Sequence, residues 1–372
     1  MSLKKYALYI SLIFTIFPFN YSKAENNKIP IEIKLIASNF TIPWGMALLP
    51  TNTMLITQRE GTLSKLDLVT SKVSTISGLP TNIKVKGQGG LLDVALSPNY
   101  NSTGWIYFSY SKNILGNGAT TLSRAKLSHN HLQKWQDLIT TQSITSTNVH
   151  YGGRITFDHN GHVFLSVGDR GIRQNAQNLG NHAGTILRLN LDGSVPIDNP
   201  YISNPNALNE IWSYGHRNPQ GLFFNIQNHA LWSIEHGPRG GDEINLIEGG
   251  HNYGWPIISY GKEYHQDVPV GQGTHLEGMQ QPIKTYSPSI APSGLIQYSG
   301  KAFKNWQGNL LTGSMKLRHL NRVVLNKKNI AIDEVRLLRG VNGRIRNIIE
   351  DSNGWIYIAS DDGRILRLKP KD

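Results

Sequence analysis

Two residues of types that exchange protons lie on either side of one expected hairpin. His150 opens the segment HYGGR at 150–154, and Asp169 lies in VGDRG at 167–171. A neutral histidine that a carboxylate orients is a competent general base near pH 7. The chain has 13 histidines, so His150 stands out only through its position and this expected partner. The pattern predicts His150 as a base and Asp169 as the group that orients it.

Cationic side chains recur at matching points of the chain. Arg217 is followed by Asn218 in GHRNPQG at 215–221, and Lys316 follows a glycine-containing strand end. Arg344 and Arg346 are two residues apart, so a strand would place both guanidinium groups on one face. Guanidinium forks bind carboxylates bidentately, and lysine supplies a point charge. Any one of these residues could be an ordinary surface cation, but together they indicate an anion site.

The segment 235–243, EHGPRGGDE, is rich in glycine and carboxylates and has no regular periodicity. Such a loop can present backbone carbonyl oxygens, which are good ligands for Ca²⁺. Its spacing does not match an EF-hand loop. From spacing alone, a calcium site and a plain turn remain equal interpretations.

A repeated unit must position these residues. Six times, an alternating strand runs into a Pro, Asn or Gly turn and then into a second alternating strand. The second strands are expected to begin near residues 54, 105, 162, 231, 309 and 355, and third strands are expected at 62–66, 185–189 and 364–368. A blade of four short strands needs about 40 to 50 residues. The repeat therefore predicts an all-β fold, a six-bladed β-propeller with four-stranded antiparallel blades; a pair of β-sandwiches is the alternative. Short helices are expected only at 131–139 and 206–212.

The propeller geometry predicts where the chemistry lies. Loops that enter the innermost strands, or that follow the second strands, meet around one end of the central channel. The residues at these positions are Gln88, His150, Arg154, Asp169, Arg217, Asn218, His236, Gly237, Pro238, Lys316, Arg344 and Arg346. We therefore expect an anion site that contains a base.

Composition excludes several classes of protein. The 372 residues are 39% hydrophobic, enough for a core, and only 17% charged, with 37 glycines. The absence of cysteine excludes disulfides, thiolate zinc sites and a cysteine nucleophile. The net charge of +12 is scattered, with no basic block, so a nucleic-acid partner is not indicated.

The N-terminus has the features of an export signal. Lys4 and Lys5 precede an apolar stretch at 6–19, and Ser22-Lys23-Ala24 fits a small-x-small cleavage site. We expect a signal peptide at 1–24 and a single propeller domain at 25–372, with net charge lowered from +12 to +9 by loss of the three lysines. An uncleaved anchor is the alternative. No later segment has 18 consecutive apolar residues, so the mature chain is expected to be soluble and periplasmic.

Several ordered motifs carry a family resemblance. The chain resembles the soluble quinoprotein glucose/sorbosone dehydrogenases, most closely the aldose sugar dehydrogenase branch, over about residues 36–370. The matching motifs are GQGGLL at 87–92, HYGGR at 150–154, VGDRG at 167–171, LRLNLDG at 187–193, GHRNPQG at 215–221, EHGP at 235–238, DEINLI at 242–247, NYGWP at 252–256 and RIR at 344–346.

The resemblance implies pyrroloquinoline quinone (PQQ), a tricarboxylic redox cofactor, and Ca²⁺. The residues that it implies for holding PQQ are Gln88, Arg217, Asn218, Tyr260, Ser314, Met315, Lys316, Arg344, Ile345 and Arg346. Those that it implies for calcium are Gly237, Pro238, Glu243 and Tyr253. In this scheme His150 takes the proton of the anomeric hydroxyl, Asp169 orients His150, and a lactone forms as hydride passes to the quinone. The reduced cofactor then passes electrons to an acceptor that the sequence does not identify.

The compact stretch at 262–281 departs from glucose-specific members and predicts broad aldose specificity, in a monomer or homodimer. Met315 and Arg318, which flank Lys316, also depart from the expected pattern. Two alternatives remain: a calcium-dependent propeller lactonase or hydrolase, which needs several carboxylates around the channel, and a non-enzymatic propeller that binds glycans and has no need of His150.

Overall fold

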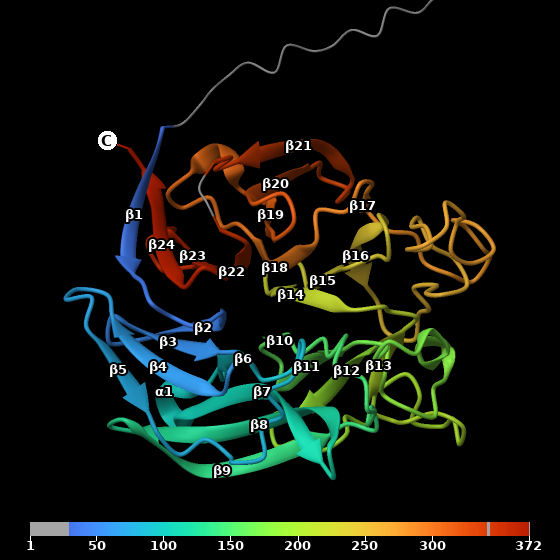
Figure 1. Cartoon of the computed structure of the whole chain (residues 1–372), viewed down its shortest axis with the longest axis horizontal. Helices are drawn as coiled ribbons and strands as arrows, with labels where there is room; N and C mark the ends of the chain where they lie inside the picture. Colours follow the sequence, from blue (N-terminus) through green and yellow to red (C-terminus); the bar gives the residue numbers. More distant parts are fainter. Residues whose placement is uncertain (1–29, 341–342, 372) are drawn as a thin grey trace, which may run out of the picture.

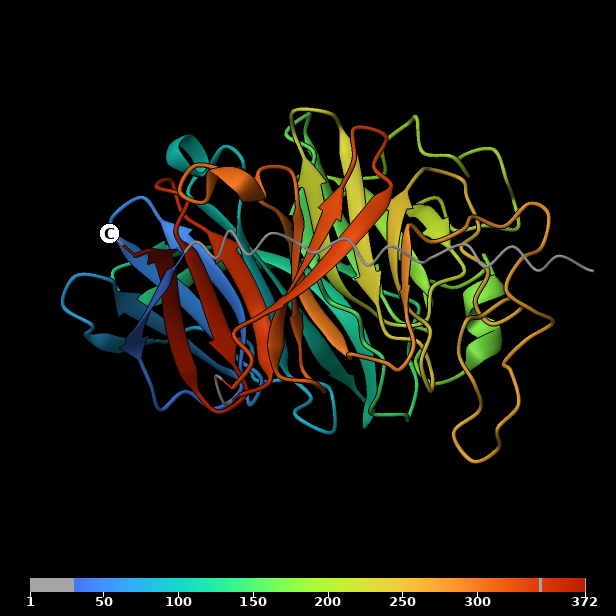
Figure 2. The ribbon, with the colours of Figure 1, turned by 90° about the horizontal axis from the view of Figure 1, so that it is seen from above.

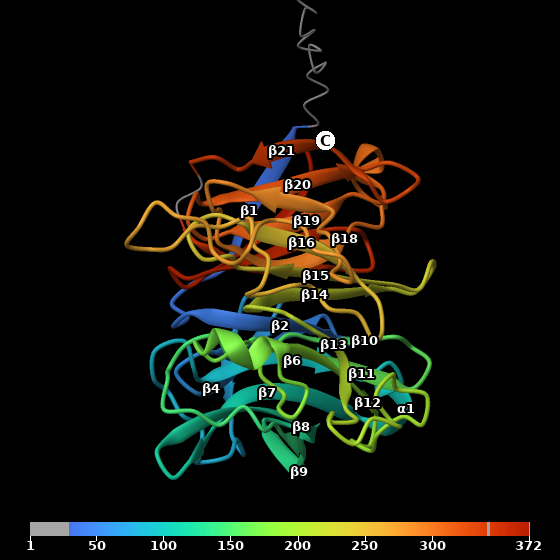
Figure 3. The ribbon, with the colours of Figure 1, turned by 90° about the vertical axis from the view of Figure 1, so that its right-hand side faces the viewer.

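The computed structural model describes residues 30–340 and 343–371, which form a six-bladed β-propeller (Figure 1). Each blade is a four-stranded antiparallel sheet, and the six sheets surround a central channel. Figures 2 and 3 show the same disc from two further sides. The predicted fold class is confirmed.

The strands follow one another outward in each of the first five blades. Blade 1 consists of β2 (Pro43–Leu49), β3 (Thr53–Gln58), β4 (Thr62–Asp67) and β5 (Val73–Ile76); blade 2 of β6 (Leu91–Leu96), β7 (Trp105–Ile114), β8 (Asn117–Ser128) and β9 (His131–Thr140); blade 3 of β10 (Ile155–Phe157), β11 (His162–Val167), β12 (Thr185–Asn190) and β13 (Ile211–Tyr214). Blade 4 consists of β14 (Pro219–Asn225), β15 (Ala230–Glu235), β16 (Asp242–Ile247) and β17 (Lys284–Tyr286); blade 5 of β18 (Pro292–Gln297), β19 (Leu310–Ser314), β20 (His319–Leu325) and β21 (Ala331–Leu337).

The sixth blade closes the ring by joining the two ends of the chain. It contains β22 (Ile345–Glu350), β23 (Ile356–Ser360), β24 (Arg364–Pro370) and, on the outside, β1 (Ile31–Ala37). β1 pairs antiparallel with β24, from Ile31 opposite Pro370 to Ala37 opposite Ile365. Because β1 pairs with β24, the sixth blade has four strands like the other five.

The strands form where alternation and turn residues predicted them. The second strands begin at residues 53, 105, 162, 230, 310 and 356, each within one residue of the prediction. β3 shows why consecutive residues of such a strand are apolar. Met54 and Ile56 pack toward blade 6, whereas Leu55 packs toward blade 2. All three are fully buried, because each sheet is covered on both faces by its neighbours.

The two predicted helices are wrong. Residues 131–139 lie in β9, where the pairing with β8 shifts between Arg124 and Lys126 and Lys134 has a φ of 54°. This bulge places Leu132 and Trp135 against the same cluster, and so produces a helix-like spacing in a strand. Residues 206–212 form a turn that leads into β13. The described helices are short: α1 (Tyr100–Thr103), η1 (Arg173–Gln177) and η2 (Lys304–Trp306).

The channel has two ends that we name by the direction of the inner strands. β2, β6, β10, β14, β18 and β22 are the innermost strands, and neighbouring ones contact each other around the ring. The near mouth is the end at which these strands begin, and the far mouth is the end at which they finish. The near mouth carries the residues singled out from the sequence.

Candidate functional site

A histidine and a carboxylate form a hydrogen-bonded pair at the near mouth. His150 precedes β10, Asp169 follows β11, and antiparallel pairing of these strands brings His150 Nδ1 to 2.7 Å from Asp169 Oδ1. Asp169 is held in turn by Trp255, whose indole Nε1–H donates to Oδ2 at 2.8 Å. The Gly171 amide donates to Oδ1 at 2.7 Å. The imidazole is therefore fixed through a fully buried and fully bonded carboxylate.

The surroundings of His150 favour its neutral form. Burial lowers the pKa of His150, the hydrogen bond to Asp169 opposes this shift, and the charge of Arg217 adds to it. Burial would raise the pKa of Asp169, but the bond to His150 and the Gly171 amide hold it below its ordinary value. An ionised Asp169 accepts from Nδ1–H, which leaves Nε2 as the free proton acceptor. The backbone of His150, at φ 52°, is fixed by its N–H donating to Gln88 Oε1 at 2.7 Å.

Beside this pair lies a small pocket to which all six blades contribute. Its volume is about 120 Å³. Of the residues that the sequence singled out, Gln88, Asn218, His236, Met315, Arg344 and Arg346 line it. Trp44, Arg59, Tyr151, Gly152 and Gln220 complete the lining, and no carboxylate belongs to it.

Three arginines line this pocket, and one acidic side chain lies close to them. Arg346 binds Asp361 through two hydrogen bonds of 2.8 Å, and Arg344 Nε donates to the same carboxylate at 3.0 Å. Burial would raise the pKa of Asp361, but Arg346 and then Arg344 hold it below its ordinary value. Burial and then the charge of Arg346 lower the pKa of Arg59. One carboxylate for three guanidinium groups leaves a positive excess, which an anionic ligand would compensate.

Arg217 lies next to this pocket, under the connection between β16 and β17. Its guanidinium donates to the His236 carbonyl and to the Tyr264 hydroxyl, each at 3.1 Å. It also lies 5.3 Å from the centre of the Trp255 ring. His236 is partly buried and donates through Nε2 to the Pro292 carbonyl at 2.6 Å; desolvation lowers the pKa of His236 to about 3, so this ring is neutral.

Besides Arg217, four residues that the resemblance implied for cofactor binding do not line the pocket. Lys316 is exposed on the turn after β19, at the same mouth. Ser314 donates to the Ile290 carbonyl and shapes that turn, and Ile345 belongs to the apolar core. Tyr260 donates to Gln281 at 2.7 Å, on the side of Glu243.

A second, much smaller void contains buried carboxylates. It measures about 10 Å³, room for about one water-sized particle, and is lined by Glu235, Glu243, Gly237 and Tyr253 among others. Burial and then the charge of Glu235 raise the pKa of Glu243 to about 8. The buried Glu235, the partly buried Glu243 and an Asn245 Oδ1 without a hydrogen-bond partner among the described residues bring acidic and oxygen groups together, which suits a cation.

The calcium residues implied by the resemblance fit this void only in part. Gly237 lines it, and Pro238 lies next along the same loop between β15 and β16. The Tyr253 hydroxyl is already used, since it donates to the Leu246 carbonyl and accepts from the Glu248 amide. Only the backbone oxygen of Tyr253 remains available. Within residues 30–340 and 343–371, no three acidic or histidine side chains converge as a metal cluster.

Several functional residues were missed from the sequence. Arg59 follows β3 directly, and Asp361 follows β23, so each occupies the place after a second strand that Asp169 occupies after β11. The positional rule used for the other blades would have found both. Trp255 lies on the long connection between β16 and β17, outside any repeat, and gave no such signal.

Comparison with known proteins decides the family. The glucose/sorbosone dehydrogenase family model matches residues 40–367. The chain belongs to the glucose/sorbosone dehydrogenase family. Among its relatives is the aldose sugar dehydrogenase YliI of Escherichia coli, 36% identical over 92% of this chain and 94% of that protein. Quinoprotein glucose dehydrogenase B of Acinetobacter calcoaceticus is 26% identical over 92% of this chain and 88% of that protein.

Solved structures of this family agree with the fold. The soluble aldose sugar dehydrogenase of Escherichia coli, in its apo-form, superposes with a TM-score of 0.88 at 34% identity, covering 92% of this chain and all of that one. The PQQ-bound aldose sugar dehydrogenase of Streptomyces coelicolor superposes with a TM-score of 0.76 at 26% identity, over 92% of this chain and 98% of that one. Across the residues described for this dehydrogenase-family chain, no helix is long and apolar enough to span a bilayer.

Proposed function

We propose that this protein is a PQQ- and calcium-dependent aldose sugar dehydrogenase that oxidises aldoses at C1 to lactones. The observation that carries the proposal is the His150–Asp169 pair beside a pocket with an excess of arginine. Relatives named aldose sugar dehydrogenases, one of them solved with PQQ bound, support it. A calcium-dependent hydrolase would need several carboxylates around the mouth, and the pocket lining has none.

The pocket residues fit a tricarboxylic cofactor. Arg346, Arg344 and Arg59 supply guanidinium groups for its acid groups, while Gln88 and Asn218 supply amide hydrogen-bonding groups. Arg217 and the exposed Lys316, at the same mouth, would approach from the rim. When bound, PQQ would supply a quinone carbon that accepts the hydride leaving C1 of the sugar.

The chain's own part in the reaction is to hold and move one proton. His150 Nε2 would take the proton of the anomeric hydroxyl, and the charge that the ring gains would be stabilised by Asp169. Trp255 keeps Asp169 in place by its 2.8 Å hydrogen bond. The carbonyl oxygens of Gly237 and Pro238 would hold the calcium that polarises the quinone, and Glu243 with the backbone of Tyr253 would hold a further calcium. The compact 262–281 stretch leaves room for a broad set of aldoses.

The test is reconstitution with PQQ and Ca²⁺, followed by aldose-dependent dye reduction over a panel of hexoses and pentoses. His150→Ala should lose about 10²- to 10⁴-fold in rate, the usual contribution of a general base, and should still bind PQQ in a spectroscopic titration. His275→Ala removes an exposed histidine whose ring bonds none of the described residues, and it serves as the matched control. Absence of PQQ binding would defeat the proposal as a whole; full activity of His150→Ala would remove His150 as the base.

Export to the periplasm is part of the proposal. The predicted signal peptide at 1–24 lies outside the described residues, and the domain from residue 25 includes the propeller. N-terminal sequencing of protein recovered from the periplasm should begin at Glu25. An intact Met1 in that fraction would contradict cleavage.

A further inference from the structure

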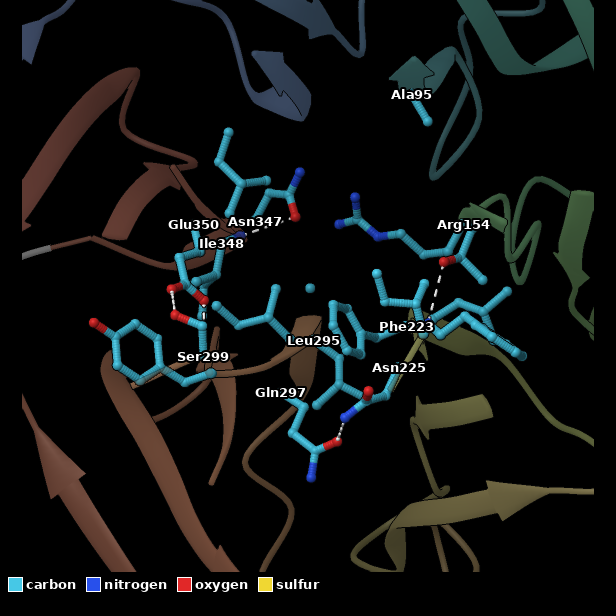
Figure 4. A pocket seen from close by; sticks show the side chains of 18 of the residues that line it. Ala95, Arg154, Phe223, Asn225, Leu295, Gln297, Ser299, Asn347, Ile348 and Glu350 are labelled. Atoms are coloured by element: carbon cyan, nitrogen blue, oxygen red, sulfur yellow. Dashed lines mark hydrogen bonds between the residues drawn. The ribbon is translucent and has the colours of Figure 1, made fainter. Parts of the chain in front are cut away.

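A large cavity lies at the far mouth, away from the His150 pair (Figure 4). Its volume is about 800 Å³, within the range of small-molecule sites. Apolar side chains of three blades form much of its wall, namely Leu222 and Phe223 of β14, Leu295 of β18 and Ile348 of β22. An apolar cavity of this size needs only a few directed polar groups to select a ligand.

Arg154 forms the floor of this cavity and separates it from the near mouth. The sequence placed Arg154 at the near mouth, but its side chain is only 3% exposed and lies inside the channel. It donates to the carbonyl oxygens of Trp44, Gln220 and Arg346 and to Asp93, at 2.7–3.3 Å. These four hydrogen bonds leave one of its five N–H groups without an acceptor among the described residues.

Asn347 presents a second unused donor to the same cavity. The residue is 6% exposed, and its Oδ1 accepts from the Ile348 amide at 2.9 Å. Its Nδ2 has no partner in the parts of the chain that the structure describes. Figure 4 shows Arg154 and Asn347 reaching into the cavity from opposite sides. Two donors that have no acceptor among the described residues and face one space favour a ligand that brings an oxygen acceptor.

The charges of the cavity favour a neutral ligand. Arg154 is compensated by Asp93, whose carboxylate lies 3.1 Å from its Nη1. At the rim, Lys301 is accompanied by Glu350 and Asp351. An anion would meet Asp93 near the floor, and a cation would meet the unused donors. A neutral carbonyl oxygen satisfies those donors and adds no charge.

We propose that the far cavity is a binding site for a neutral ring compound that carries a carbonyl oxygen. The carbonyl would accept hydrogen bonds from Arg154 and Asn347, and the ring would pack on Leu222, Phe223, Leu295 and Ile348. The site is distinct from the proposed PQQ site and does not depend on the proposed function. The alternative is a channel mouth filled only by water.

The test compares three probes of similar shape by equilibrium titration of the cofactor-free protein. These are 1-tetralone, which has a carbonyl, tetralin, which lacks an acceptor, and 1-naphthoate, which is an anion. We expect 1-tetralone to bind at least about fivefold more tightly than either of the others, the size of one hydrogen bond. Equal binding of tetralone and tetralin, tighter binding of naphthoate, or no saturable binding would each overturn the proposal.

A variant locates the binding. Asn347→Asp keeps the oxygen that accepts from Ile348 and replaces the free donor by an acceptor, so the advantage of tetralone over tetralin should disappear. Unchanged selectivity in a variant with a native circular dichroism spectrum would contradict the role of Asn347. If that variant fails to fold, a competition titration of 1-tetralone against PQQ in the native protein replaces it. Displacement of 1-tetralone by PQQ would place the probe at the near mouth and overturn the proposal. Simultaneous binding of both compounds would support it.

Discussion

The two mouths of one channel differ in chemistry although the same six strands form both. The near mouth encloses about 120 Å³ lined by three arginines, whereas the far mouth encloses about 800 Å³ with walls of mixed polar and apolar side chains. Arg154 lies between them and bonds carbonyl oxygens of three residues that line the near pocket. The larger of the two cavities is therefore not the one beside the His150–Asp169 pair.

The difference arises from where loops meet strands. At the near mouth, the chain presents residues just before an inner strand or just after a second strand, and these positions carry His150, Asp169, Arg59 and Asp361. At the far mouth, β2, β6 and β10 end in apolar residues, whereas β14, β18 and β22 end in Asn225, Gln297 and Glu350. The arginines that line the near pocket therefore have no counterpart among the residues with which the inner strands finish.

The strongest test of the near mouth is Asp169→Asn. An amide in place of the carboxylate offers the His150 ring the wrong hydrogen-bonding pattern and no charge, so the rate of dye reduction should fall about 10²- to 10⁴-fold. PQQ binding, measured by titration, should change little, because Asp169 does not line the pocket. A rate within twofold of the native value would show that the pair does not act as a unit.

The second test compares two arginines that share one acid. Arg346 has a side chain 8% exposed and makes two bonds to Asp361, whereas Arg344 is 50% exposed and makes one. Arg346→Gln should weaken PQQ binding about 10- to 100-fold and lower the melting temperature, because it leaves a buried carboxylate poorly paired. Arg344→Gln is the matched control, with a smaller loss expected in both measurements. A larger loss of PQQ affinity in Arg344→Gln than in Arg346→Gln would mean that Arg344 is the more important of the two for binding.

These cases show how far sequence reasoning reaches. Alternation and turn residues predicted all six second strands, because a buried sheet needs both to form. The bulge at Lys134 was not predictable, since it depends on the pairing of β9 with β8. Arg154 lies in the channel because Gly152 and Gly153, with φ of 65° and 95°, turn the chain inward. Tyr253 was identified by its motif, but its hydroxyl is taken by backbone groups that the motif does not specify.

Trp255 offers a subtler test of the near mouth. Trp255→Phe keeps the ring beside Arg217 but removes the N–H that donates to Asp169, so the carboxylate becomes more basic and raises the pKa of His150. Because the proposed base, His150, would act in its neutral form, the acid limb of the pH–rate profile should move to higher pH, with about a three- to tenfold loss of rate. A loss of rate with an unmoved acid limb would mean that Trp255 contributes packing alone.

The void at Glu243 should link stability to pH and calcium. A carboxyl whose pKa is raised on folding to about 8, from an ordinary 4.5, stabilises the fold at low pH. That contribution is lost as pH rises from about 4.5 to about 8. Without calcium, the melting temperature should therefore fall by several degrees over this range; saturating Ca²⁺ should remove the fall by favouring the ionised carboxylates. Glu243→Gln should lose both effects, and a calcium response that persists there would place the ion elsewhere.

The smallest expected effect is the one that separates the two mouths. Asn347 lies on β22 one residue beyond Arg346, in the direction of the far mouth. Arg346 lines the near pocket, whereas Asn347 lines the far cavity together with Arg154 (Figure 4). Dye reduction by Asn347→Asp with saturating PQQ should therefore stay within about twofold of the native rate while tetralone selectivity is lost. If the rate instead falls together with selectivity, the Arg154 floor transmits changes between the mouths, and the channel is one site with two openings.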